Sequence, residues 1–251
     1  MSSSIWTRCA GDSEIRPLRR APWRAVEAQH QVSTRKLVDS LDEQELLEEL
    51  IDRAKPPDVT QGGLHYLLFT PFRYPTLPHG SRFGTRRERG IWYGSESRRT
   101  VFSEVAYYRL VFLEGTSADL GAVTTQLTAF TVRMRTERGI DLTAPPFDAH
   151  RRAIASRSSY TATQSLGAAM RGAGVELFRY PSARDVDGGI NVGAFAPTVF
   201  GSSQPRDFET WHCRATRASV EFAKHDYFAR DSFAFERSAF LVGGVLPAPA
   251  V

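Results

Sequence analysis

The sequence predicts an α+β fold, with a mixed or antiparallel β core and flanking helices. Segments with strand character outnumber those with helical periodicity, and they do not alternate in the regular βαβ order of a parallel sheet. Sixteen Phe, eight Tyr and four Trp among 251 residues supply ample apolar surface to bury. We therefore expect a folded chain, built as one main domain with an appendage.

Residues 1–60 are expected to form a helical extension, and residues 61–251 the main domain. The stretch from Ser40 to Glu43 has the form of a capping box, in which a serine and a glutamate bond the first free amides of a helix. Apolar residues then follow at helical spacing until Pro56-Pro57 end the helix: Leu47, Leu50, Ile51 and Ala54. This apolar stripe requires a partner surface, on the main domain or on another chain.

After Pro57 the pattern changes to short strands with two interspersed helices. The helices are expected over residues 100–113 and 161–174, and the second runs into glycine. Strands are expected within residues 62–75, 90–95, 127–137, 175–183, 190–200, 211–229 and 232–244.

Several classes of protein are excluded by what the sequence lacks. The N-terminus has no apolar stretch of the signal-peptide type, and no segment approaches the roughly 18 apolar residues of a membrane span. Cys9 and Cys213 are the only cysteines, which argues against a disulfide framework and a cysteine-based metal site. The six histidines are scattered, and the motifs of zinc hydrolases, serine hydrolases and nucleotide-binding loops are absent. We expect a cytoplasmic protein without a metal site.

Arginine supplies most of the positive charge. Only three of the 32 basic residues are lysines, which leaves 29 arginines and a net charge of +4. One segment is especially dense in arginine: Arg73, Arg82, Arg86, Arg87, Arg89, Arg98 and Arg99. Because a guanidinium group binds phosphate oxygens in a bidentate manner, this segment suits a phosphate-bearing ligand. A solvated basic loop is the alternative.

Glu104 projects from the edge of the face of helix 100–113 that is expected to enter the core. At about 100° per residue, Val105, Tyr108 and Phe112 fall within about 40° of Val101, and Glu104 falls just beside Tyr108. A carboxylate at such a position is costly unless it is paired or has a function. A structural ion pair is the alternative reading, with one of three arginines as the partner: Arg82, Arg98 or Arg109.

Glu104 is also the last of three residues at an even spacing. Arg82, Tyr93 and Glu104 are eleven residues apart each time, in a turn, at a strand end and on a helix. The wider pattern reads Arg82-Phe83, Gly90, Tyr93 and Ser103-Glu104-Val105 in a first block. A second block reads Pro181-Ser182-Ala183, Gly188-Gly189 and Asn191, which is the only asparagine of the chain.

In order and spacing, these two blocks resemble the RES-domain family, which is named for an arginine, a glutamate and a serine. The similarity covers about residues 62–200. An arginine-rich loop between Arg82 and Tyr93 and the N-terminal extension depart from the family pattern.

The resemblance implies an ADP-ribosyltransferase-like fold and an enzyme that consumes NAD as its substrate, with no separate cofactor. It further implies a toxin of a bacterial toxin–antitoxin pair, with an Xre-type antitoxin as partner and water or inorganic phosphate as acceptor. Modification of a cellular protein by mono-ADP-ribosylation is the first alternative. A nucleic-acid-binding module is the second, although no binding motif supports it. A homo-oligomer remains open, and neither a membrane nor a specific nucleic acid is expected as a partner.

Each residue of the pattern has an expected role in that chemistry. Glu104 would stabilise the positive charge that develops on the ribose as its bond to nicotinamide breaks. Tyr93 would stack on nicotinamide or cap the ribose, and Arg82 would bind the pyrophosphate or the ribose beside it. Ser182 would bond the ribose or the amide and help to hold the carboxylate. The remaining candidates for substrate binding are Asn191, Arg73 and Arg86.

Overall fold

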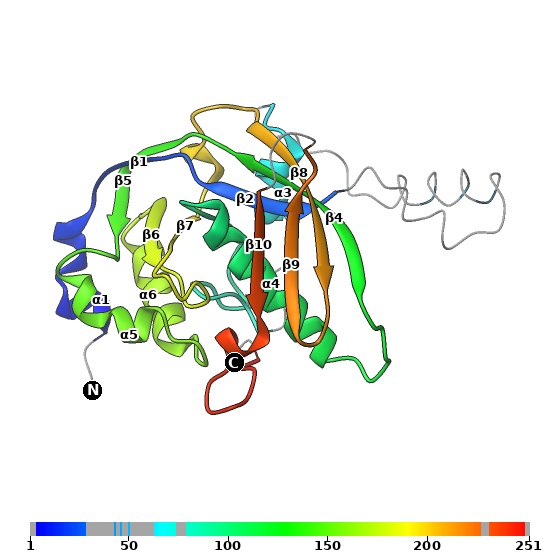
Figure 1. Ribbon diagram of the computed structural model, residues 1–251. Helices are drawn as coiled ribbons and strands as arrows, with labels where there is room; N and C mark the ends of the chain where they lie inside the picture. Colours follow the sequence, from blue (N-terminus) through cyan, green and yellow to red (C-terminus); the bar gives the residue numbers. More distant parts are fainter. Residues whose placement is uncertain are drawn as a thin grey trace.

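The computed structural model describes residues 4–28, 63–73, 79–226 and 231–248, together with Glu43, Leu46 and Leu50. Within these residues the strands form one ten-stranded sheet in the order β1-β5-β6-β7-β3-β2-β4-β8-β9-β10, and only β5 and β6 are parallel neighbours (Figure 1). The strands are β1 (Arg16–Arg20), β2 (Trp23–Glu27), β3 (Trp92–Ser95), β4 (Val123–Thr131), β5 (Met134–Asp141), β6 (Leu177–Pro181), β7 (Ile190–Ala194), β8 (Arg206–Ala215), β9 (Ser219–Lys224) and β10 (Ser232–Glu236).

Helices pack on both faces of this sheet. Because the sheet is antiparallel except for one pair of strands, the predicted α+β class is confirmed. The α-helices are α1 (Ile5–Arg8), α3 (Tyr66–Arg73), α4 (Arg98–Glu114), α5 (Arg151–Ile154) and α6 (Thr161–Gly172). Short 3₁₀ helices are η1 (Gly11–Glu14), η3 (Phe147–His150), η4 (Pro197–Val199) and η5 (Arg237–Phe240). None of the helices in the described residues is long and apolar enough to cross a membrane.

The sheet consists of two parts that meet weakly between β3 and β2. One residue pair, Trp23 and Ser95, joins these two strands, whereas β2 pairs with β4 along its whole length. Figure 1 shows β1, β5, β6 and β7 on one side of α4 and β4, β8, β9 and β10 on the other. Because β2 and β3 diverge after a single pair, the sheet opens at this point.

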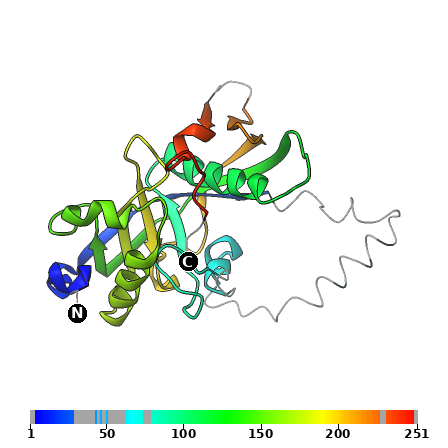
Figure 2. The same cartoon turned by 90° about the horizontal axis from the view of Figure 1, so that it is seen from below.

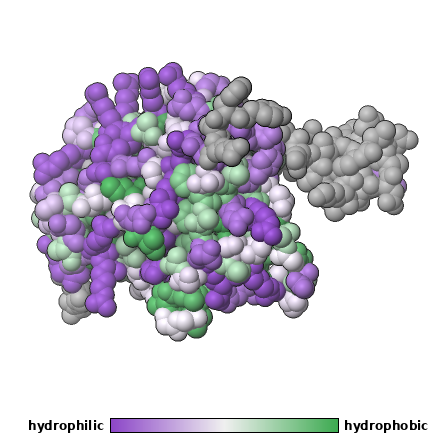
Figure 3. Space-filling model, in the orientation of Figure 1, coloured by the Kyte–Doolittle hydropathy of each residue, from purple (hydrophilic) through white to green (hydrophobic). Residues whose placement is uncertain are grey.

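Each part of the sheet has its own hydrophobic core. Helix α4 packs on the β4-β8-β9-β10 part, where Phe102 contacts Trp211 and Phe222. Helices α1, α5 and α6 cover one face of the other part, and α3 packs against β3 on the sheet face opposite α4 (Figure 2). The face of the molecule that Figure 3 shows, in the orientation of Figure 1, is mostly hydrophilic, with a narrower hydrophobic area near its centre.

The predicted helical extension over residues 1–60 is wrong for residues 16–27, which contain two strands after the short helices α1 and η1. Strands β1 and β2 belong to the central sheet, where β1 pairs with β5 and β2 lies between β3 and β4. Pairing with strands about a hundred residues away leaves no signal in the local sequence. The helix expected after Ser40, with the stripe of Leu47, Leu50, Ile51 and Ala54, lies largely outside the described residues; Leu50 is helical.

Two strand predictions are also corrected. Residues 62–75 contain helix α3, whose Leu67 and Leu68 are buried beside Trp92. A short apolar run does not distinguish a strand from a buried helix by its period. The single strand expected over residues 127–137 is two strands, β4 and β5, which lie in different parts of the sheet.

Gly167 allows α6 to lie directly against the backbone beside Arg82. A Cβ atom at this position would lie 2.0 Å from the carbonyl oxygen of Phe83. We expect Gly167→Ala to lower the free energy of unfolding by about 1–3 kcal/mol, since helix or loop must shift. Urea denaturation measures this change, and Gly172→Ala is the control because open space surrounds that position on the same helix. Equal stability of Gly167→Ala and the wild type would contradict the prediction.

Candidate active site

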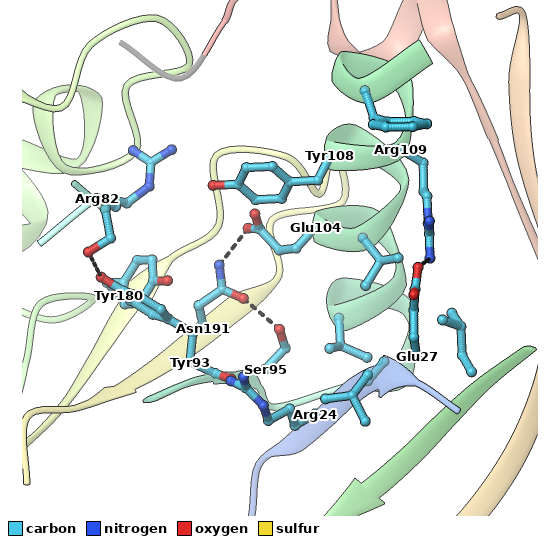
Figure 4. A pocket seen from close by; sticks show the side chains of 18 of the residues that line it. Arg24, Glu27, Arg82, Tyr93, Ser95, Glu104, Tyr108, Arg109, Tyr180 and Asn191 are labelled. Atoms are coloured by element: carbon cyan, nitrogen blue, oxygen red, sulfur yellow. Dashed lines mark hydrogen bonds and ion pairs between the residues drawn. The ribbon is translucent and has the colours of Figure 1, made fainter. Parts of the chain in front are cut away.

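A cavity of about 510 Å³ lies where β2 and β3 diverge, with α4 along one side. Its volume is in the range of pockets that bind small molecules and cofactors. Figure 4 shows Glu104 near its middle, with Arg82 on one side and the ion pair of Arg109 and Glu27 on the other. Of the residues predicted from the sequence, four line this one cavity: Arg82, Tyr93, Glu104 and Asn191.

Helix α4 brings Glu104 to the cavity. Ser97 caps the helix by accepting a hydrogen bond from the Thr100 amide at 3.1 Å, so the helix starts two residues before the predicted start. The side chains that enter the core are Phe102, Ala106, Tyr107, Leu110 and Leu113.

The predicted core face of this helix is wrong. Val101 is buried, but Tyr108 is 46% exposed and Phe112 is 59% exposed, and both line the cavity. The helix has two apolar faces, and the one with the larger buried side chains packs on the sheet. Glu104 therefore lies at the edge of a cavity-lining face.

Two neutral donors hold one oxygen of the Glu104 carboxylate. Ser182 Oγ donates to Oε1 at 2.7 Å, and Asn191 Nδ2 donates to the same atom at 2.6 Å. Within the described residues, no side chain forms a hydrogen bond or ion pair with Oε2 of Glu104. The carboxylate is thus fixed through one oxygen, while the other is left for a ligand.

The orientation of both donors is set by their own partners. Ser182 Oγ accepts hydrogen bonds from the amides of Arg184 and Asp185, at 3.1 and 3.0 Å, so its single proton points to Glu104. Asn191 Oδ1 accepts from Ser95 Oγ at 2.7 Å, which directs the Nδ2 group to the carboxylate.

This arrangement follows from the register of three strands. Ser95 on β3, Asn191 on β7 and Tyr180 on β6 are direct neighbours across the sheet. Side chains in such a row project from the same face. Tyr93, two residues before Ser95, projects from this face as well.

Tyrosines line the cavity on the Arg82 side of Glu104. The Tyr93 hydroxyl lies 3.0 Å from Ser81 Oγ and accepts from the Phe83 amide at 3.2 Å. Burial raises the pKa of Tyr93 to about 12, so the hydroxyl stays protonated at neutral pH. Tyr180 is 6.3 Å from Tyr93 between ring centroids, and burial raises its pKa as well. These rings form an apolar wall with polar tips.

Arg82 is bound by the protein through part of its guanidinium group. Its Nη1 donates to the carbonyl oxygens of Ile154 and Ser156, at 3.3 and 2.8 Å, and the group lies 4.7 Å from the ring centroid of Tyr160. A carboxylate partner for it is lacking among the residues that the structure describes. Its positive charge therefore remains available to the cavity.

None of the three arginines considered as ion-pair partners forms an ion pair with Glu104 in the described residues. Arg98 pairs with Glu209 and Asp231, and Arg109 pairs with Glu27.

Two other acidic residues near Glu104 in the sequence or in its second block, Glu96 and Asp185, do not line the cavity. Glu96 pairs with Arg20 and Arg179. Asp185 accepts from Thr100 Oγ1 at 2.8 Å, which attaches the Ser182 loop to the first turn of α4.

One protein-family model matches this chain. The RES domain model matches residues 53–215, which is more than half of the sequence. The chain belongs to the RES-domain family. RES domains are linked to NAD-related toxin function. No curated protein matches the sequence.

Arg73 and Arg86 do not line the Glu104 cavity of this RES domain, so the structure does not bring them together with the other predicted site residues. They line a second cavity of about 610 Å³, together with Arg87 and Arg89. Arg86, Arg87 and Arg89 follow the bridge between Ser81 and Gly84 and line this cavity beside Phe195 and Pro197, and Arg73 reaches it from the end of α3. A basic segment in the sequence thus divides between two surfaces.

The sequence interpretation missed several residues that complete the RES-domain cavity. Ser95 could have been found as the next residue on the same face of the strand as Tyr93. Tyr108 lies one helical turn after Glu104. Arg24 had no available signal, because its strand enters the site only through tertiary pairing.

Proposed function

We propose that this RES domain cleaves the nicotinamide–ribose bond of NAD, with water or phosphate as acceptor. It would act as an NAD glycohydrolase or phosphorylase, with an ADP-ribosyltransferase-like fold, and as the toxin of a toxin–antitoxin pair. The observation that supports this most is the state of Glu104. Its carboxylate faces the cavity, is held by two neutral donors and has no ion-pair partner among the described residues.

An unpaired, fixed carboxylate suits a cationic transition state. As the C–N bond breaks, its electron pair leaves with nicotinamide and positive charge develops on the ribose. Oε2 of Glu104 would accept a hydrogen bond from a ribose hydroxyl and stabilise that charge without reorganisation. An oxygen of water or phosphate then forms the new bond to the ribose carbon, and water releases a proton. The products are nicotinamide and either ADP-ribose or its phosphate ester.

The tyrosines support a place for the leaving group. Nicotinamide is flat and aromatic, and the wall of Tyr93 and Tyr180 lies beside Glu104 (Figure 4). Arg82 would attract the anionic part of the dinucleotide into the cavity.

Release of nicotinamide from NAD by the purified full-length chain tests the proposal. We expect turnover, and the product formed with inorganic phosphate present separates a phosphorylase from a glycohydrolase. Absence of nicotinamide release with both acceptors would contradict NAD cleavage by water or phosphate. Transfer of label from NAD to a protein in a cell lysate would then favour the ADP-ribosyltransferase instead.

A further inference from the structure

The second cavity, of about 610 Å³, lies between the end of α3 and the loop that follows Gly84. We call it the arginine cavity. Its apolar lining includes Phe69 and Phe72 from α3 and Phe195, which directly follows β7. It shares no lining residue with the Glu104 cavity, so the proposed cleavage step does not use it.

The charge that lines the arginine cavity is mainly positive. Four arginines line it, against the single carboxylate of Glu88. That carboxylate accepts from a backbone amide at 2.6 Å and lies 3.9 Å from Arg171. Arg86, Arg87 and Arg89 are exposed, and none of them pairs with a carboxylate in the part of the chain that the structure describes. Like charges held together above an apolar surface suit a partner that is both acidic and apolar.

The chain itself carries a segment of that composition, which the catalytic proposal does not use. Residues 42–52 contain six carboxylates, no basic residue and four leucine or isoleucine residues. Leu46 and Leu50 are helical and lie one turn apart, so they project from the same face. Leu46 is 56% exposed and Leu50 is 50% exposed, so a single chain leaves this apolar face uncovered.

We propose that two copies of this chain associate, with residues 42–52 of each copy bound in the arginine cavity of the other. The leucines would pack on the three phenylalanines, and the carboxylates would pair with the exposed arginines at the rim. Because a two-fold axis repeats the contact, the association closes as a dimer. A nucleic-acid strand would match the arginines as well, but it would leave Leu46 and Leu50 uncovered. This inference does not depend on NAD cleavage.

Sedimentation equilibrium of the full-length chain, without NAD, tests the association. We expect a dimer for the wild type. Arg86→Glu with Arg87→Glu should weaken it at least about 10-fold, as should Glu48→Arg with Glu49→Arg, because like charges then meet in both contacts. An equimolar mixture of these two double variants should recover a heterodimer, since the reversed segment of one then meets the reversed cavity of the other. A general loss of folding would not be repaired by mixing.

Two further variants complete the test. Arg151→Glu with Arg152→Glu is the matched control, because these neighbouring arginines on α5 are exposed and line neither cavity. This control should stay dimeric. Leu46→Ser with Leu50→Ser should weaken the dimer about 10-fold through lost apolar contact, and both positions are exposed in the single chain.

Four outcomes would overturn the proposal. The first is a wild type that stays monomeric at every concentration, even if it cleaves NAD, which would leave the proposed function intact. The second is a dimer that both charge reversals leave unchanged. The third is a monomer whose stability falls in each reversal and recovers when both are combined in one chain, since the segment would then bind its own cavity. The fourth is a monomer that binds a single-stranded oligonucleotide through Arg86 and Arg87.

Discussion

Glu104→Gln is expected to reduce kcat for NAD cleavage by about 10²- to 10⁴-fold, since it removes the negative charge opposite the developing cation. Glutamine keeps the size of the side chain, and its carbonyl oxygen can still accept from Ser182 and Asn191. The fold should therefore persist, and the effect should fall on kcat more than on KM. Nicotinamide release at saturating NAD measures it.

Glu137→Gln is the matched control for this experiment. Glu137 is an exposed carboxylate on β5 and does not line the cavity. Loss of activity in both variants would indicate a general effect of charge. In bacteria, expression of the wild type should arrest growth and Glu104→Ala should relieve the arrest. Equal arrest at matched protein levels would contradict the role of Glu104.

Asn191→Leu is expected to lower kcat by about 10- to 100-fold, because it removes one of the two donors that orient the Glu104 carboxylate. Leucine has a similar shape but offers no donor to Glu104 and no acceptor to the buried Ser95 hydroxyl. The free energy of unfolding should fall by about 1–3 kcal/mol for the unsatisfied group. Steady-state kinetics and urea denaturation measure the two effects separately.

A lower kcat in Asn191→Leu could come from lower stability of the fold or from a lost orientation of the Glu104 carboxylate, and a control variant separates the two causes. Thr136→Val removes a buried hydroxyl that donates to Glu176, away from the cavity. This control should lower stability with little change in kcat. Combining Asn191→Leu with Ser182→Ala should give less than the product of the single effects, since both donors act on one oxygen. A wild-type kcat in Asn191→Leu would contradict the orienting role.

Much of the site could be read from local patterns in the sequence. The spacing of Arg82, Tyr93 and Glu104 indicated one cleft, and the structure brings all three to one cavity. Ser182 does hold the carboxylate, as expected from its block. These predictions succeed because a turn, a strand and a helix that follow one another in the chain are often neighbours in space.

Other features depended on contacts between distant segments. The apolar face of α4 could be recognised, but which of its two apolar faces enters the core depends on β8, β9 and β10. The arginine-rich loop could be recognised, but Arg73 and Arg86 face a different cavity from Arg82. Ion-pair partners are likewise set by packing, so Arg98 and Arg109 were equally plausible for Glu104 until their own partners were known.

The sequence by itself determined the α+β class, the RES-domain pattern and helix α4 with its glutamate, because each depends on composition or on neighbouring residues. Only the tertiary structure decided that residues 16–27 complete the sheet, that Glu104 has no ion-pair partner in the described chain, and that Arg24 reaches its cavity. The physical reason is that strand pairing and charge pairing are chosen among distant segments by register and burial. Local periodicity carries no record of that choice.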